Sequence, residues 1–169
     1  MEARCNRLLY GGLSYIERLY IMVRLIEELA KLDAPIVFKD AMVLKTALSG
    51  YPLNTERTTR DIDGDWVGNP PSMEYLNNII NTALSRIGPT YTSTPYREYG
   101  QGKSAGFTIH DNGEEIFTID LSIKQNPYSI YYTTFNGVQF VGASPQKMFV
   151  EPFILKSSGN LTWNGNDWI

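Results

Sequence analysis

The residues best suited to chemistry lie in the segment Asp61-Ile62-Asp63-Gly64-Asp65, where three aspartates occupy alternate positions. Side chains of an extended strand alternate between its two faces, so this spacing predicts that the three carboxylates share one face. Like charges about 6–7 Å apart along a strand repel one another unless a positive group lies between them. Because hard divalent cations prefer carboxylate oxygens, the segment predicts a cation site.

A further acid, Asp120, lies in the apolar run Ile116-Phe117-Thr118-Ile119-Asp120-Leu121. An ionised carboxylate in such surroundings is costly without a partner, so we expect Asp120 at an exposed edge or beside a cation. If its strand lies next to that of Asp61 and Asp63, the three carboxylates converge. Such a set can hold two Mg²⁺ or Mn²⁺ ions that clamp a triphosphate and polarise an attacking hydroxyl, as in-line nucleotidyl transfer requires.

Two plainer interpretations of the aspartate segment remain. It could be a solvated strand whose acids are paired by Arg57 and Arg60, because exposed charge most often serves solubility. It could also be a calcium loop, but an EF-hand needs glycine at its sixth position and an acid at its twelfth. Here Gly64 is fourth and Ser72 twelfth, which disfavours the calcium loop.

Composition excludes several other kinds of site. Cys5 is the single cysteine and His110 the single histidine of the 169 residues. A disulfide framework and a cysteine zinc site are therefore excluded, and a histidine-rich metal site or a Ser-His-Asp triad is disfavoured. His110 lies next to a hairpin signal, and we expect it to be an exposed residue at a strand end.

Charge and hydropathy predict a soluble, cytoplasmic protein without membrane contact. The formal net charge of -3 argues against a general basic surface for nucleic acid, and Arg97, Lys103 and Lys124 are too scattered to indicate one. The sequence has neither an apolar run of about 18 residues, as a membrane span needs, nor a signal-peptide pattern at its N-terminus.

The first half of the chain has helix and strand signals around the acids. Apolar residues three or four apart predict a helix from the capping residues Ser14 and Glu17 to about Leu32. A buried strand is expected at 35–38, a second helix through Val43, Leu44, Ala47 and Leu48, the acidic strand at 58–67, and a third helix from Ser72 to Gly88-Pro89.

The second half is typical of antiparallel strands with glycine turns. Asn112-Gly113 and Asn136-Gly137 are hairpin signals, and we expect a meander of segments 104–110, 115–124, 128–135 and 138–142. The chain is thus predicted to be one α+β domain over residues 1–156, with a mixed or antiparallel sheet and helices mainly on one face. A polar tail is expected at residues 157–169.

The order of these motifs resembles the nucleotidyltransferases of the AbiEii/AbiGii toxin family, in the polymerase-beta-like nucleotidyltransferase superfamily. The resemblance covers roughly residues 14–125 and is carried by Phe38-Lys39-Asp40-Ala41, Arg57-x-x-Arg60-Asp61-Ile62-Asp63 and Thr118-Ile119-Asp120. It implies that Asp61 and Asp63 are the metal-binding pair and that Asp120 is the third acid of the catalytic set.

The resemblance also implies a nucleotide site. Lys39 matches the lysine before two family glycines, and Asp40 and Arg60 border the same nucleotide site. Lys147, in the weaker match Ser144-Pro145-Gln146-Lys147, is the fourth residue assigned to this site. Asp40 and Ala41 depart from the family because they replace the two small residues that let the backbone approach a phosphate, and a carboxylate there would repel a triphosphate. The chain also ends before most of the helical C-terminal region of such toxins.

Two functions follow from these motifs. The first is a metal-dependent, toxin-like nucleotidyltransferase that uses an NTP to modify a hydroxyl of an RNA, such as a tRNA, or of a protein. The resemblance implies a cognate antitoxin and a role in phage defence. The second is an inactive binding module with the same fold, encoded by a mobile element or phage, that engages a host protein or nucleic acid. In either case Asp65 is assigned to the surface or to a supporting position behind the metal ligands.

Overall fold

The computed structural model describes residues 15–39, 60–100, 102–123 and 128–144. The predicted second helix and the C-terminal tail lie outside the described residues. The elements follow one another in the order α2 (Tyr15–Lys31), β1 (Ile36–Lys39), β2 (Asp61–Trp66), α4 (Met73–Ile87), β3 (Tyr91–Arg97), β4 (Ala105–Asp111), β5 (Glu114–Ser122), β6 (Ser129–Thr133) and β7 (Gln139–Ala143).

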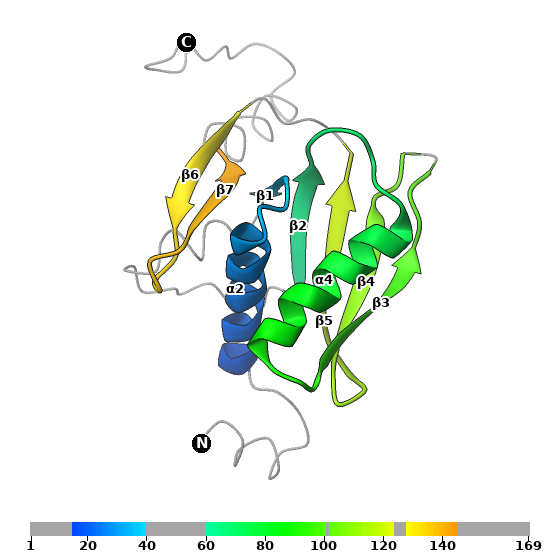
Figure 1. Cartoon of the computed structure of the whole chain (residues 1–169), viewed down its shortest axis with the longest axis vertical. Coiled ribbons are helices and arrows are strands. Elements are labelled where there is room, and N and C mark those ends of the chain that lie inside the picture. The colour runs from blue at the N-terminus through cyan, green and yellow to red at the C-terminus, as the bar shows by residue number, and fades with distance from the viewer. Residues whose placement is uncertain (1–14, 40–59, 101, 124–127, 145–169) are drawn as a thin grey trace, which may run out of the picture.

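The seven strands form one mixed sheet in the order β3-β4-β5-β2-β1-β7-β6. β2 is parallel to β5 and β1 is parallel to β7, whereas the other neighbours are antiparallel. Helices α2 and α4 lie side by side on one face of this sheet (Figure 1). The predicted α+β class, with helices mainly on one face, is confirmed. Neither described helix is long and apolar enough to cross a membrane.

The core lies between the helices and the sheet. Ile62 of β2 and Ile119 of β5 are fully buried in one cluster with Leu25 of α2 and Leu84 of α4. Burying a side chain of this size contributes about 1.5–3 kcal/mol. Gly64 faces the same layer, where an added Cβ would lie only 2.7 Å from Cγ2 of Ile36. The glycine between two aspartates therefore leaves room for the side chain of Ile36 beneath the helices.

Helix α4 begins and ends where its sequence signals predict. The hydroxyl of Ser72 accepts a hydrogen bond of 3.1 Å from the backbone N–H of Tyr75. At the other end, the N–H of Gly88 donates to the carbonyl of Leu84 at 3.1 Å. Both contacts satisfy backbone groups that a helix end otherwise leaves unpaired.

The predicted hairpins are present, but the predicted meander is wrong. Asn112 and Gly113 have φ values of 52° and 82°, as a tight turn of the primed type requires, and they join β4 to β5. Residues 134–138 likewise join β6 to β7. The two hairpins are not neighbours, however, because β2 and β1 lie between β5 and β7. Short-range turn signals define each hairpin, whereas their separation results from long-range pairing.

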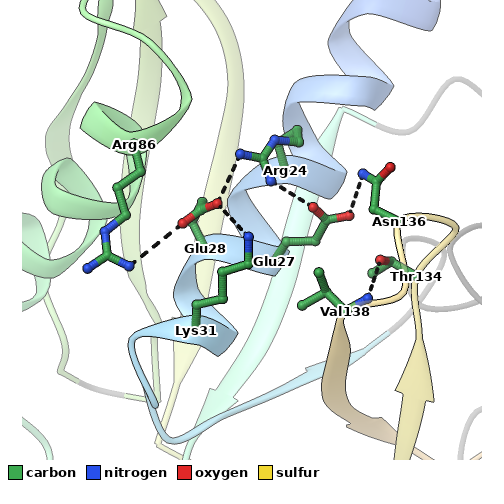
Figure 2. A network of polar contacts seen from close by, with 8 residues as sticks. All are labelled: Arg24, Glu27, Glu28, Lys31, Arg86, Thr134, Asn136 and Val138. Carbon is green, nitrogen blue, oxygen red and sulfur yellow. Dashed lines mark hydrogen bonds and ion pairs between the residues drawn. The ribbon is translucent and has the colours of Figure 1, made fainter.

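Two buried acids of α2 connect this helix to both of its neighbours (Figure 2). Glu28 accepts a hydrogen bond of 2.9 Å from Arg24 and lies 3.8 Å from Nη1 of Arg86 on α4. Glu27 accepts hydrogen bonds of 2.8 Å from Arg24 and of 2.9 Å from Asn136 in the β6–β7 turn. These polar contacts compensate the buried carboxylates and join α2 to both α4 and the hairpin.

Glu28→Gln should lower the free energy of unfolding and make it depend less steeply on pH in the acid range. Burial alone would raise the pKa of Glu28, but hydrogen bonds from Lys31 and Arg24 outweigh this effect and leave the pKa below its ordinary value of 4.5. Stability from such a group is complete above the unfolded-state pKa and is lost as the pH falls through the folded-state pKa. We expect Glu28→Gln to reduce the free energy of unfolding at neutral pH by about 1–3 kcal/mol in urea titrations.

The matched control for this measurement is Glu98→Gln, because Glu98 is exposed. Its effect should stay within about 0.5 kcal/mol. An equally steep loss of stability toward acid in Glu28→Gln and in the wild type would contradict the assignment to Glu28.

Candidate functional site

The aspartates of β2 lie on the sheet face opposite the two helices. Ile62 and Trp66 are 0% and 5% exposed and belong to the core on the helix side. Since strand side chains alternate, Asp61, Asp63 and Asp65 share the other face. The alternation predicted from the sequence is therefore observed.

The parallel pairing of β2 with β5 places Asp120 beside Asp63. In this register Asp61 is opposite Thr118, Asp63 is opposite Asp120, and Asp65 is opposite Ser122. Strands in a sheet lie about 4.8 Å apart, so residues opposite each other are direct neighbours. The condition for convergence of the acids, that the Asp120 strand lies next to the Asp61 and Asp63 strand, is therefore met.

One row of residues crosses five strands at this level. It consists of Arg97 on β3, Gly106 on β4, Asp120 on β5, Asp63 on β2 and Lys39 on β1. We call these five residues the charge row. Its two central acids have a cationic residue on each side, which lowers the repulsion expected of neighbouring like charges.

Asp120 is held from β3. Its Oδ1 accepts a hydrogen bond of 2.7 Å from Nη2 of Arg97 and one of 2.5 Å from the hydroxyl of Tyr96. Burial, followed by the hydrogen bond and the negative charge of Asp120, raises the pKa of Tyr96 to about 12. Tyr96 is therefore a protonated donor at neutral pH.

Asp65 is the partner of Lys39. Nζ of Lys39 donates to Oδ1 of Asp65 at 2.9 Å, and the hydroxyl of Ser122 donates to the same oxygen. Asp65 is only 3% exposed, so the surface position considered for it is wrong. The lysine expected at a nucleotide is thus bound to an acid that lies one position further along the same face of β2.

The other predicted residues differ in how far the structure describes them. Asp61 is exposed and accepts a hydrogen bond from the hydroxyl of Thr118. Arg60 precedes it with an exposed side chain, and its carbonyl accepts from the backbone N–H of Thr118 at 3.2 Å. Asp40 and Lys147 lie outside the described residues, as do Ala41 and Arg57.

The strand register brings three potential ligands of a divalent cation to one face of the sheet, but their side chains do not gather around one point. Asp61, Asp63 and Asp120 offer carboxylate oxygens from one face of two paired strands, which suits Mg²⁺ or Mn²⁺. Within the described ranges, however, no three acidic, histidine or cysteine side chains gather closely enough to hold a metal ion. Oδ1 of Asp120 is paired with Nη2 of Arg97 at 2.7 Å.

Tyr96 and Ser122 were not predicted as parts of this site, and Arg97 was considered only as a scattered basic residue. Pro95 provides a signal that could have found two of them, because proline inside a strand marks an edge or a bulge. β3 is an edge strand with a register shift between Pro95 and Arg97. No comparable signal exists for Ser122.

His110 takes no part in the charge row. It lies at the end of β4, as expected, but it is half-buried rather than exposed. Its Nε2 lies 2.9 Å from Oγ1 of Thr94 on β3.

Comparison with solved structures shows that the fold is nucleotidyltransferase-like. The chain matches MenT4, a nucleotidyltransferase toxin from Mycobacterium tuberculosis H37Rv, with a TM-score of 0.52 and 13% sequence identity. The match covers 82% of this chain and 51% of MenT4, so the chain spans about half the length of that toxin. At this identity the likeness shows the fold alone.

A second match is to the megavirus polyadenylate synthase, with a TM-score of 0.40 and 14% identity over 75% of this chain and 25% of that one. A score this low carries no argument about fold or function. No protein-family model and no curated protein matches the sequence. The nucleotidyltransferase-like fold implied by the resemblance is confirmed, whereas membership of the AbiEii/AbiGii family stays a prediction.

Lys39→Met should destabilise the protein even in the absence of any ligand. The change leaves the carboxylate of Asp65, whose side chain is 4% exposed, without its cation. Because Lys39 is itself 31% exposed, we discount the cost of a fully buried pair and expect a loss of about 1–3 kcal/mol in urea unfolding.

The double variant Lys39→Met/Asp65→Asn is the control for that experiment. Since it removes the acid together with the cation, it should be more stable than the sum of the two single effects predicts. Strictly additive effects would show that the pair is not coupled.

Proposed function

We propose that this chain is a metal-dependent nucleotidyltransferase that transfers a nucleotide from an NTP to a hydroxyl of an RNA or a protein. The observation that carries the proposal is the register of β2 with β5, which makes Asp63 and Asp120 direct neighbours and keeps Asp61 on their face. The acids lie on a nucleotidyltransferase-like fold, on the face that neither described helix covers.

In this proposal Asp61, Asp63 and Asp120 would hold Mg²⁺ or Mn²⁺. When bound, the ion would neutralise charge on the triphosphate and polarise the attacking hydroxyl. The chain contributes the carboxylates on two strands that the core keeps in register, so the ligands need little reorganisation of the backbone.

Cationic groups on either side of the acids would meet the triphosphate. Lys39 and Arg97 are the ends of the charge row, and Arg60 is exposed beside Asp61. Charge-assisted hydrogen bonds from such groups bind phosphate oxygens more strongly than neutral donors do. Asp40 and Lys147 lie outside the described residues, and we retain them as proposed nucleotide-binding residues.

We include a toxin-like role in the proposal. MenT4 is a nucleotidyltransferase toxin, and the motif order resembles a family of nucleotidyltransferase toxins. The acceptor would be a tRNA or a protein hydroxyl, a cognate antitoxin would be the partner, and phage defence would be the setting.

A second candidate function is an inactive binding module that engages a host protein or nucleic acid. Two ion pairs favour the binding module. Nη2 of Arg97 lies 2.7 Å from Oδ1 of Asp120, and Nζ of Lys39 lies 2.9 Å from Oδ1 of Asp65. These cations compensate acids of the site from within the chain. The Asp40-Ala41 sequence, where the resembling family has glycines, favours the same candidate.

Asp63→Ala should abolish the binding of a Mg²⁺-triphosphate complex. We expect isothermal titration with Mg²⁺ and a nonhydrolysable NTP to give heat with the wild type and none with the variant, because the variant loses a central ligand. Glu114→Ala is the matched control, since Glu114 is an exposed acid at the start of β5.

Absence of heat from the wild type at millimolar ligand would overturn the enzyme proposal. The binding module then makes its own prediction, which is that Asp61→Ala and Asp63→Ala leave biological activity intact. Loss of activity in either variant would count against the module.

A further inference from the structure

The bulge in β3 brings two consecutive side chains to one carboxylate. In a regular strand Tyr96 and Arg97 would point to opposite faces. The register shifts between Pro95 and Arg97, and both side chains donate to Oδ1 of Asp120. Bulges of this kind redirect side chains and are frequent beside active sites.

Tyr96 reaches Asp120 by lying across β4, the strand between β3 and β5. It passes over Gly106, where an added Cβ would lie 2.4 Å from Cζ and 2.7 Å from the hydroxyl oxygen of Tyr96. Gly106 is not one of the glycines with positive φ, so its backbone does not require glycine. The missing side chain at this position instead gives the tyrosine ring its path to Asp120.

Both hydrogen bonds end on the same oxygen of Asp120. Together they fix the orientation of the carboxylate group, and neither of them uses Oδ2. A carboxylate that is held through one oxygen can present the other oxygen to a cation without losing its orientation.

We propose that Tyr96 is a positioning residue for the third carboxylate, holding Oδ1 of Asp120 so that Oδ2 is presented to the divalent cation. This inference rests on the proposed function, because it concerns the same site. Gly106 is part of the arrangement, since the ring crosses β4 only where no Cβ is present. Removing a hydrogen bond to a metal ligand typically lowers metal affinity or activity about 10–100-fold.

A substitution of Tyr96 can test the orientation of the Asp120 carboxylate without changing the charge of the site. A substitution of Arg97 changes both. Arg97 is anchored independently, because its Nε donates to the carbonyl of Ser104 at 2.9 Å and its Nη2 to the Ser104 hydroxyl at 2.8 Å. A guanidinium beside a cation also repels it, so removing Arg97 would have two opposing effects on metal affinity. Removing the Tyr96 hydroxyl changes no formal charge.

The test is Mn²⁺ binding followed by electron paramagnetic resonance, without nucleotide, in Tyr96→Phe and Gly106→Ala. Tyr96→Phe removes only the hydroxyl, whereas Gly106→Ala keeps every hydrogen-bonding group and displaces the ring. We expect both variants to bind Mn²⁺ at least about 10-fold more weakly than the wild type. In an activity assay the half-saturating Mn²⁺ concentration should rise by a similar factor, while kcat at saturating metal stays within about 2-fold.

Tyr99→Phe is the matched control, because the buried hydroxyl of Tyr99 has no hydrogen-bond partner among the described residues. It should bind Mn²⁺ as the wild type does. Urea unfolding without metal verifies that each variant is folded, and if Gly106→Ala is not, Tyr96→Phe decides alone.

The outcomes separate this inference from the function on which it rests. Wild-type affinity in Tyr96→Phe would overturn the positioning role and leave the enzyme proposal intact. A wild type that binds no Mn²⁺, alone or with a triphosphate, would overturn both.

Discussion

The parallel pairing of β2 with β5 is the interaction on which the site depends. Ile62 and Ile119 are opposite each other in this pairing and are both fully buried beneath the helices. A slip of one residue would turn one of the strands over and move its apolar side chains out of the core, so the register is strongly specified. The same register makes Asp63 and Asp120 neighbours. Hydrophobic packing on one face of the sheet thus sets the distance between charges on the other.

Charge compensation at the site comes from the strands that flank the acids. Neighbouring carboxylates destabilise a sheet, and Arg97 and Lys39 reduce that cost from opposite sides. The compensation is not symmetrical, because Arg97 binds Asp120 within the charge row whereas Lys39 binds Asp65. A cation or a triphosphate arriving at this face meets side chains that already have partners. Its binding therefore involves an exchange of partners as well as the formation of new contacts.

Short-range patterns in the sequence predicted much of this arrangement. The alternation at Asp61, Asp63 and Asp65, the cap at Ser72 and the two Asn-Gly turns all depend on neighbouring residues, and the structure has each of them. From the sequence, the pairing of the two acidic strands was only a condition for the acids to converge, and the structure meets that condition.

Features that depend on distant residues were not predictable in the same way. Asp65 is buried, and the partners that compensate its carboxylate, Lys39 and Ser122, lie 26 and 57 positions away in the chain. The sequence pattern does not indicate Tyr96, because a bulge interrupts the two-residue period on which strand patterns rely. The order of the strands likewise depends on pairings between segments that are remote in the chain.

The long separation along the chain between β2 and β5 has a consequence for folding. Thr118 and Asp61 meet across 57 positions, so this contact forms only after a long loop has closed at a cost in chain entropy. Topologies dominated by such pairings fold more slowly than those built from local contacts. The β4–β5 and β6–β7 hairpins need no such closure, so a partly folded chain can contain both of them before β2 joins β5. A nascent chain in that state already carries its aspartates but has no site, and any activity begins only when the centre of the sheet is complete.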